Sequence, residues 1–488
     1  MPFPFVEAPA FIGGALLPAL HFLFGLSATL AAGGALLMLV PGYQASWSVD
    51  PRWSALARRS ARAVLVLLLG VAAPAGAGAW VGEMVLRPQA VERLAAAFGG
   101  ALAAGWLLLL LGGVFLAGYA WGWRRGRGGS PAHLAAGLLA AGGLWLGAAV
   151  FVSLQSFPVN PGRWLESRAP RDALLHPTLI PAFALWGATA VLLASAAGLA
   201  YASAQRDAPW RMSLVQVLAK WAAPAAGVGA AAGLGWALSL PAGTVDKGLA
   251  GLVGAAVLLQ AGLGVYLALH GVRLPGKFNR RGALAAAAAA VLAPVLLWQA
   301  REEARGPFLV RGYLYRNGIL AEQIETFRRE GFWRPAAWGR EKGAPAPEAL
   351  GALVFRAECA PCHPSWRTGA RQAALPPFRY EGSVLQFLNG MEERHPDFPA
   401  FAGSEGEKRA VAVHIEGLLQ AAGVTLAARP PQPPAAPPAP PKTEEKKTPP
   451  PAPKPPEPAR AGPPRARKRT RSTLPPPARN PSKRKSTI

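Results

Sequence analysis

Cysteine is nearly absent from this sequence, because 488 residues contain only Cys359 and Cys362. Two thiols are too few for a disulfide framework or for a zinc site built on four thiolates. Charge is also scarce, since Asp, Glu, Lys and Arg together make up 16% of the chain. From Pro9 to about residue 300, long runs of Ala, Leu, Gly and Val are broken only by short arginine-bearing loops. Charge this sparse and uneven excludes an ordinary series of soluble domains.

The apolar runs predict eight membrane-spanning helices, because about 20 apolar residues cross a hydrocarbon core about 30 Å thick. The runs lie near residues 10–40, 61–83, 95–121, 133–155, 178–203, 213–239, 248–270 and 283–299. The first run is too long, and its flanks are wrong, for a cleaved signal peptide, so we expect it to be retained as the first span. The predicted fold class is therefore all-α, with a polytopic helix bundle over residues 1–300.

Lys and Arg are concentrated in the loops that follow the odd-numbered spans. These basic residues are Arg52, Arg58, Arg59, Arg62, Arg124, Arg125, Arg127, Arg206, Arg211, Arg273, Lys277, Arg280 and Arg281. The intervening loops hold fewer, so the positive-inside rule places both termini on the outer, periplasmic side of a bacterial cytoplasmic membrane.

The segment Cys359-Ala360-Pro361-Cys362-His363 has the spacing at which a c-type haem is attached. Two thiols three positions apart add across the vinyl groups of one haem, and the histidine that follows ligates the iron. A thiol–disulfide redox pair is the alternative, but the flanks lack the βαβ pattern that this chemistry uses. The sequence therefore predicts one covalent haem c. Such haem is attached on the outer side of the membrane, in agreement with the predicted topology.

The haem motif lies in a predicted domain of residues 346–424. A helix over 348–358 delivers the cysteines, and an amphipathic helix over 405–421 closes the domain. Two helices around a covalent haem resemble a small class I cytochrome c.

In class I cytochromes c, the loop before the last helix commonly carries a methionine that ligates the iron from the distal side. This chain has Phe398 at that position. Met391 and His395 lie close by in the sequence and are equal candidates to replace it. The third alternative is an open or water-ligated iron.

Two further segments flank the haem domain. Residues 301–345 mix charges with six aromatic residues and are expected to form an interfacial segment along the membrane surface. These aromatics are Phe308, Tyr313, Tyr315, Phe332, Trp333 and Trp338.

Residues 425–488 form a tail rich in Pro, Lys and Arg, with fifteen basic residues against three acids after residue 428. Such a composition cannot bury a core, so we expect a disordered, extended chain, partly polyproline II. The tail is either simply solvated or tethers the protein to anionic lipid, cell-wall polymer or an acidic partner. On the outer side of the membrane, nucleic acid is not expected as a partner.

His21 lies well inside the first apolar run. An ionisable residue at that depth is costly, and two explanations are equally weighted: ligation of a haem iron, or a hydrogen bond to a neighbouring helix.

The stretch Leu20-His21-Phe22-Leu23-Phe24 resembles the opening helix of subunit I of the cytochrome bd quinol oxidases, where a histidine ligates a b-type haem. The resemblance continues to about residue 205 and implies the same role for His21. The other similar segments are Gly70-Val71-Ala72, Trp80-Val81-Gly82-Glu83, Val114 to Arg124, His133-Leu134, Leu144-Trp145 and Ser156 to Pro161.

The chain departs from that family where the oxygen chemistry is performed. Two glutamates of the family's third helix fall at Ala104 and Gly112, and the histidine for its second b haem falls near Leu185. His176 can substitute only if the loop changes register. The long quinol-binding loop is reduced to residues 241–247. Without the glutamates, oxygen reduction has no evident proton supply.

The remaining polar residues receive simpler interpretations. His133 and His270 are predicted to be wetted histidines at span ends, and His414 a surface histidine. Glu83 lies near the outer end of the second span, where it can reach water.

Three functions follow from these observations. The preferred one is a membrane-bound electron-transfer subunit of a respiratory complex, with haem c and at most one b haem, on His21. Its electrons come from quinol, directly or through other membrane and redox subunits, and leave to a soluble or membrane acceptor. The first alternative is an active bd-like quinol:oxygen oxidase with a fused cytochrome c. The second is a structural anchor for the haem domain. Spans rich in Gly and Ala, as in 229–233, favour close packing, within the chain or with partner subunits.

Overall fold

A computed structural model describes residues 15–332, 347–360, 380–394, 399–421 and 423–428. Over these ranges the chain is almost wholly helical, and its named strands are limited to one short hairpin. The predicted all-α class is therefore confirmed. All the described residues belong to one compact unit, Met1–Pro430.

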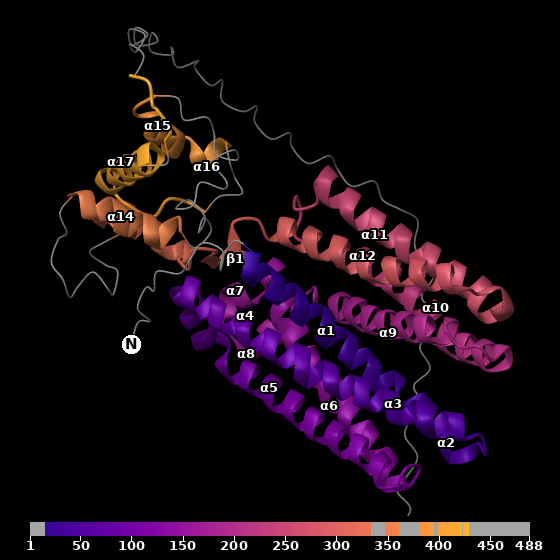
Figure 1. The fold of residues 1–488 in the computed structure, drawn as a ribbon. Coiled ribbons are helices and arrows are strands. Elements are labelled where there is room, and N and C mark those ends of the chain that lie inside the picture. Colours follow the sequence, from indigo (N-terminus) through magenta and orange to yellow (C-terminus); the bar gives the residue numbers. More distant parts are fainter. Residues whose placement is uncertain (1–14, 333–346, 361–379, 395–398, 422, 429–488) are drawn as a thin grey trace, which may run out of the picture. The chain divides into compact units, whose positions relative to one another are not determined.

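Eight helical stretches are long and apolar enough to cross a membrane, as the sequence predicts (Figure 1). They are Leu17–Trp47, Pro51–Leu86, Ala90–Arg124, Pro131–Val159, Leu179–Ser203, Ala208–Leu238, Lys247–Arg273 and Arg280–Arg305. The chain is therefore a multi-pass membrane protein. The last stretch continues to Arg305, so residues 301–305 belong to a helix rather than to the segment that follows the bundle.

The first four stretches are built from α1 (Leu17–Leu37), α2 (Leu39–Trp47), α3 (Pro51–Leu67), η2 (Leu68–Ala72), α4 (Ala73–Leu86), α5 (Pro88–Arg124), α6 (Pro131–Ser156) and η3 (Phe157–Val159). The last four are built from α9 (Leu179–Ser203), α10 (Ala208–Leu238), α11 (Lys247–Tyr266), η4 (Leu267–Arg273) and α12 (Arg280–Arg305). Short α7 (Trp164–Ser167), α8 (Pro170–Leu174) and η5 (Pro275–Lys277) lie in loops. Both η2 and η4 are π-helices, which occur often at functional sites.

Polar residues begin five of the membrane helices. Each accepts a hydrogen bond on its side chain from a backbone N–H of the first turn, which satisfies a donor that has no partner inside the helix. These capping residues are Asp50, Ser130, Asp207, Asp246 and Asn279. In α3 and α6 a proline directly follows the cap, where its missing N–H costs nothing. The sequence therefore fixes where these helices begin.

Glycine allows pairs of helices to approach to backbone contact. A Cβ built on Gly33 of α1 would lie 1.9 Å from the carbonyl oxygen of Ala190 in α9. In the same way, a Cβ on Gly143 of α6 would lie 2.8 Å from Cα of Gly112 in α5. Lipid gives helices no hydrophobic drive to associate, so such close packing is a main source of bundle stability.

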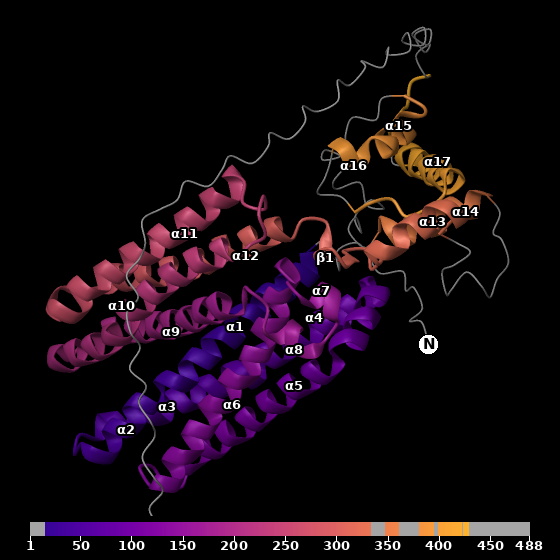
Figure 2. The ribbon, with the colours of Figure 1, turned by 180° about the vertical axis from the view of Figure 1, so that it is seen from behind.

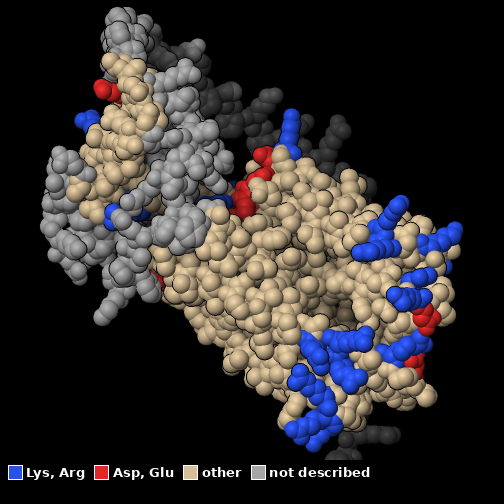
Figure 3. Space-filling view, in the orientation of Figure 1, with Lys and Arg blue, Asp and Glu red and all other residues tan. Residues whose placement is uncertain are grey.

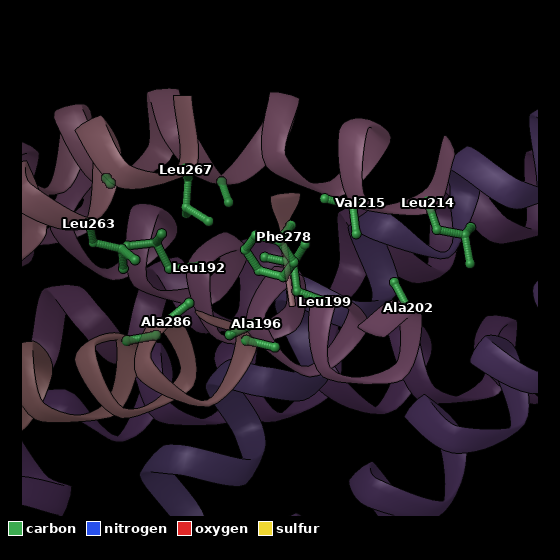
Figure 4. Close-up of a cluster of buried hydrophobic side chains, with 14 of the residues drawn as sticks. Leu192, Ala196, Leu199, Ala202, Leu214, Val215, Leu263, Leu267, Phe278 and Ala286 are labelled. Atoms are coloured by element: carbon green, nitrogen blue, oxygen red, sulfur yellow. The ribbon is translucent and has the colours of Figure 1, made fainter. Parts of the chain in front are cut away.

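Helices α9 to α12 form the second half of the bundle and lie side by side in both ribbon views (Figures 1 and 2). Aliphatic and aromatic side chains fill the space between them (Figure 4). Leu192 and Leu199 of α9 meet Val215 of α10, Leu267 of η4 and Phe278. This half of the bundle is thus joined by an apolar cluster.

The segment after the last span contains β1 (Phe308–Val310), β2 (Leu314–Tyr315), η6 (Ala321–Gln323) and α13 (Ile324–Glu330). The two strands pair antiparallel. Three of the aromatic side chains that were expected at the membrane surface pack against other protein residues. Phe308 stacks on Tyr315 with 4.5 Å between ring centroids, and the ring centroid of Tyr313 lies 5.0 Å from that of Trp164. Trp333 and Trp338 lie outside the described residues.

The C-terminal helices are α14 (Pro347–Glu358), α15 (Ser383–Asn389), α16 (Met391–Arg394) and α17 (Glu405–Ala421). Both helices predicted here are confirmed, α17 with the predicted bounds and α14 with one residue added at its start. Helices α14 and α17 pack closely, since a Cβ on Gly351 would lie 2.2 Å from the carbonyl oxygen of Ala410.

Adjacent glycines of α6 provide a test of the close contact with α5. Gly143→Ala is expected to lower the free energy of unfolding by about 1–3 kcal/mol, because the new methyl group overlaps the backbone of Gly112. Gly142→Ala is the matched control: a Cβ there has no neighbour within 4 Å, so the change is expected to be neutral or stabilising by up to about 1 kcal/mol. Unfolding in detergent micelles, followed by circular dichroism, measures both. Equal effects would contradict the contact.

Candidate functional site

Cys359 is the first residue after α14. Its N–H donates to the carbonyl oxygen of Phe355 at 2.9 Å, so the helical turn continues through it, and its side chain is half-buried. Cys362 and His363 lie outside the described residues. The structure therefore positions one of the three residues of the attachment motif, directly after the helix that the sequence predicts.

An apolar cluster lies between α13, α14, α15 and α17. Its buried members include Phe327, Val354, Phe355, Val384, Val411 and Ile415. Cys359 and Met391 both pack against this cluster, whereas His395 and Phe398 lie outside the described residues. A haem c needs a thiol for its vinyl group and an apolar surface for its macrocycle, so the placement of Cys359 fits the group. Met391, at the start of α16, borders the same surface and stays a candidate ligand.

Ser404 and Glu407 form a capping box at the start of α17. The N–H of Ser404 donates to Glu407 Oε2 at 2.8 Å, and the N–H of Glu407 donates to Ser404 Oγ at 3.3 Å. Glu407 Oε2 also accepts from the N–H of Phe332 at 2.8 Å, which ties the segment after α13 to the last helix. The spacing Ser-x-x-Glu was a usable sequence signal for this cap.

Glu358, directly before Cys359, is a second buried carboxylate that sequence reasoning missed. It is 6% exposed, and its Oε2 accepts a hydrogen bond from the N–H of Ala402 at 2.9 Å. Its Oε1 is buried without a hydrogen-bond partner among the described residues. Burial, helped by the negative charge of Glu407, raises the pKa of Glu358 to about 8, against the opposing effects of the Ala402 N–H and Arg328. The carboxyl is therefore mainly protonated at neutral pH.

His414 lies on α17 and faces Phe355 of α14, so it is half-buried rather than fully exposed. Its ring centroid is 5.3 Å from that of Phe355, and its side chain is half-buried. Burial, together with the charge of Arg356, lowers the pKa of His414. Its role is to pack the two helices.

In the bundle, His21 lies on α1 beside the end of α4. Its Nδ1 is 3.0 Å from the carbonyl oxygen of Leu17, and because a carbonyl only accepts, Nδ1 carries the proton. Its Nε2 lies 3.6 Å from Glu83 Oε1, and Glu83 also pairs with Arg87 at 3.3 Å. With the proton on Nδ1, Nε2 is the ring nitrogen able to ligate a metal, and in this structure it faces the Glu83 carboxylate. Glu83 is paired with Arg87 rather than simply reaching water.

A group of arginines surrounds Glu302 at the end of α12. Its Oε2 lies 2.6 Å from Nη2 of Arg305 and 3.6 Å from Nη2 of Arg316, and its Oε1 lies 3.9 Å from Nη2 of Arg301. Arg87, the partner of Glu83, also interacts with Glu302 through its charge. Glu83, Arg87 and Glu302 therefore belong to one run of charged side chains, with His21 beside it, that the sequence analysis did not connect. The sequence signal was the pair of arginines around Glu302 and Glu303 directly after an apolar run.

The positions that the sequence resemblance aligns with oxygen-reducing residues are closed or apolar. A Cβ on Gly112 would lie 2.7 Å from the backbone nitrogen of Leu144, so a glutamate side chain has no room there. Leu185, the position that the resemblance aligns with a haem-ligating histidine, packs in an apolar cluster with Val159, Trp236 and Leu297. Ala104 is exposed on the bundle surface.

His176 is buried and fully engaged in hydrogen bonding. Its Nδ1 lies 2.9 Å from Thr178 Oγ1, and its Nε2 lies 3.3 Å from Ser156 Oγ and 3.1 Å from the carbonyl oxygen of Ser153. Burial lowers its pKa to about 4, so the ring is neutral. Neither nitrogen is open to an iron, and His176 does not replace the missing ligand.

His133 is not the wetted histidine that the sequence suggested. It is 6% exposed and stacks on Tyr119 with 4.3 Å between ring centroids, while Trp123 meets its edge at 5.0 Å. His270, in η4, is half-buried beside Tyr266. Both histidines contribute to packing.

Among the described residues, no group of three or more His, Cys, Asp or Glu side chains is arranged to hold a metal ion.

Comparison with known proteins bears on this bundle. Neither a protein-family model nor a curated sequence matches the chain. A solved structure does match: the bd oxidase from Geobacillus thermodenitrificans, with a TM-score of 0.55 and 15% identity, over 64% of this chain and 90% of that one. The chain shares the fold of a bd oxidase. At this identity the likeness concerns the fold alone, and it agrees with the resemblance read from the residues around His21.

The protonation of Glu358 predicts a pH-dependent stability of the C-terminal helices. The pKa of this carboxyl rises from an ordinary value of 4.5 to about 8 on folding, so the folded state holds a proton that the unfolded state releases. The contribution of this carboxyl to the free energy of unfolding is complete below pH 4.5. It is lost as the pH rises to about 8, by up to about 1.4 kcal/mol per pH unit. Hydrogen exchange of α17 amides in the full-length protein, corrected for intrinsic rates, measures this loss.

Glu358→Gln is expected to remove this pH dependence, because the amide does not titrate. Glu405→Gln is the control in the same region. The hydrogen bond with Lys408 lowers the pKa of the exposed Glu405 side chain, so this substitution is expected to change the pH dependence of stability only at acid pH. A Glu358→Gln variant that keeps the slope between pH 5 and 8 would contradict the assignment.

Proposed function

We propose that this protein is a membrane-bound electron-transfer subunit of a respiratory complex. Electrons enter from quinol, directly or through partner subunits, and pass to a covalently bound c-type haem on the outer face. The observation that carries the proposal is the pairing of the attachment motif, whose Cys359 borders an apolar cluster, with a bundle that shares the bd oxidase fold.

The haem site is assigned residue by residue. Cys359 and Cys362 hold the haem by thioether bonds, His363 ligates the iron from one side, and Met391 or His395 ligates it from the other. The haem supplies one-electron redox chemistry. Val354, Phe355, Val411 and Ile415 exclude water from the core beside the site. A thioether ligand favours a high reduction potential and two histidines a lower one, so the potential identifies the distal ligand.

Electron transfer is favoured over oxygen reduction by the packing of α5 and α9. Gly112 contacts the backbone of α6 and Leu185 lies in an apolar cluster, so neither position offers a carboxylate or a haem ligand. The loop over 241–247 is a short turn closed by the N–H of Thr244 donating to the carbonyl oxygen of Pro241 at 3.1 Å. In the described part of the bundle, these positions therefore offer neither the proton supply nor the long loop that the resemblance to the bd quinol oxidases implies for oxygen reduction.

The orientation rests on the distribution of basic residues. Loops after odd-numbered spans hold most of the Lys and Arg of the bundle, and Figure 3 shows these blue side chains gathered at one end of it. With this end in the cytoplasm, the even number of spans places the C-terminal domain outside, where haem c is attached. The partners are then other redox subunits, the quinone pool and an outer electron acceptor, with no role for nucleic acid.

Covalent haem is the first test. The full-length protein is expected to carry one c-type haem per chain by pyridine haemochrome spectrum, and to keep it on a denaturing gel stained for peroxidase activity. Cys359→Ser and Cys362→Ser should each lose most of the covalent haem, whereas Ser404→Ala should keep it. A wild-type chain without covalent haem would overturn the proposal.

His21 is the single b-haem ligand proposed in the bundle. A reduced-minus-oxidised spectrum is expected to show one b-type band per chain, absent in His21→Ala and present in the control His270→Ala. Retention of the band in His21→Ala would place the ligand elsewhere. A wild-type spectrum with haem c alone would leave the bundle as an anchor and move electron entry to the partner subunits.

A further inference from the structure

A groove of about 580 Å³ lies along one side of the second span. It is lined by Arg58, Arg59 and Arg62 at one end and by Ala63, Val66, Leu67 and Val71 over the rest. All seven residues come from α3 and η2, so the groove follows a helix axis from a charged end to an apolar end.

None of the three arginines has an acidic partner in the part of the chain that the structure describes. Arg59 donates to the hydroxyl of Tyr201 at 3.2 Å, and neither Arg58 nor Arg62 pairs with Asp or Glu among the described residues. By contrast Arg52, six residues before Arg58 on the same helix, is paired with Asp50 at 2.8 Å. The groove therefore presents uncompensated positive charge at the end of a membrane helix.

The apolar part of the groove runs into the membrane span. Val66 is 61% exposed, so the surface remains open to lipid. Val71 lies in the π-helix η2, whose wider turn changes the direction of the side chains beyond α3. From Arg58 to Val71 the helix rises about 20 Å, more than one leaflet of a core about 30 Å thick. The groove thus has the length and polarity of one lipid molecule.

We propose that this groove is a binding site for an anionic phospholipid. Arg58, Arg59 and Arg62 bind the phosphate of the headgroup through charge-assisted hydrogen bonds, and one acyl chain lies along Val66, Leu67 and Val71. The net positive charge selects an anionic lipid over a zwitterionic one or a neutral quinone. This inference does not depend on the haem assignments, so either can fail without the other.

Native mass spectrometry of the delipidated full-length protein in detergent tests the site. The probes are phosphatidylglycerol and cardiolipin, with phosphatidylcholine and a quinone as comparisons. Replacing Arg58, Arg59 and Arg62 together by Gln is expected to weaken binding of the anionic lipids about 100-fold, from about 1 kcal/mol for each charge. Replacing Arg273, Lys277 and Arg281 together by Gln removes the same charge elsewhere on the same end of the bundle. Because these residues do not line the groove and salt screens exposed charges, this change should leave that binding within about 3-fold.

The outcomes separate the alternatives. Equal losses in the two triple variants, with both folded by circular dichroism, would overturn the site in favour of general surface charge. Equal binding of phosphatidylcholine or quinone would overturn the charge selectivity. Displacement of the lipid by millimolar inorganic phosphate would show a simple anion site and overturn the role of the apolar groove.

Discussion

Close backbone contact between helices is the constraint on which the rest of this structure depends. A bilayer offers helices no hydrophobic drive to associate, so small residues that allow dense packing must supply it. Gly33 against Ala190 and Gly112 against Gly143 are such contacts. The same contacts decide what chemistry the bundle can hold. At Gly112 the neighbouring backbone occupies the space of any side chain, so a catalytic carboxylate and this packing exclude each other.

Charged side chains at the ends of α4 and α12 are paired with one another. An ion pair inside a membrane protein must recover the cost of desolvating both groups, which favours networks over single pairs. At the ends of α4 and α12, Glu83 lies between His21 and Arg87, and Glu302 lies among three arginines. On α3, Arg58 and Arg62 have no such partner among the described residues. The paired groups can stabilise the protein alone, whereas the unpaired ones require counterions from outside it.

The fold was largely predictable from sequence because its signals are local. Apolar runs of membrane-spanning length predict the eight spans, and a polar cap before proline is a usable signal for the starts of α3 and α6. The residues that sequence reasoning misjudged are those whose surroundings come from distant segments. His133 is buried by Tyr119 and Trp123 of the preceding helix, and Glu358 by contact with Ala402. The neighbouring residues in the sequence do not indicate that these two side chains are buried, since each looks like an ordinary polar residue at a helix end.

The C-terminal domain joins folding to its proposed cofactor. A small domain buries too little apolar surface to be very stable alone, and this one also buries the two carboxyl groups of Glu358 and Glu407. Protonation of Glu358 and the hydrogen bonds of Glu407 in its capping box reduce the cost of burying these two carboxyl groups, without adding apolar area. A haem attached at Cys359 would extend the apolar cluster of Phe355 and Val411 by its macrocycle. Such a haem would be part of the core as well as the redox group, and the attachment that would fix it for electron transfer would also prevent its loss from a small domain.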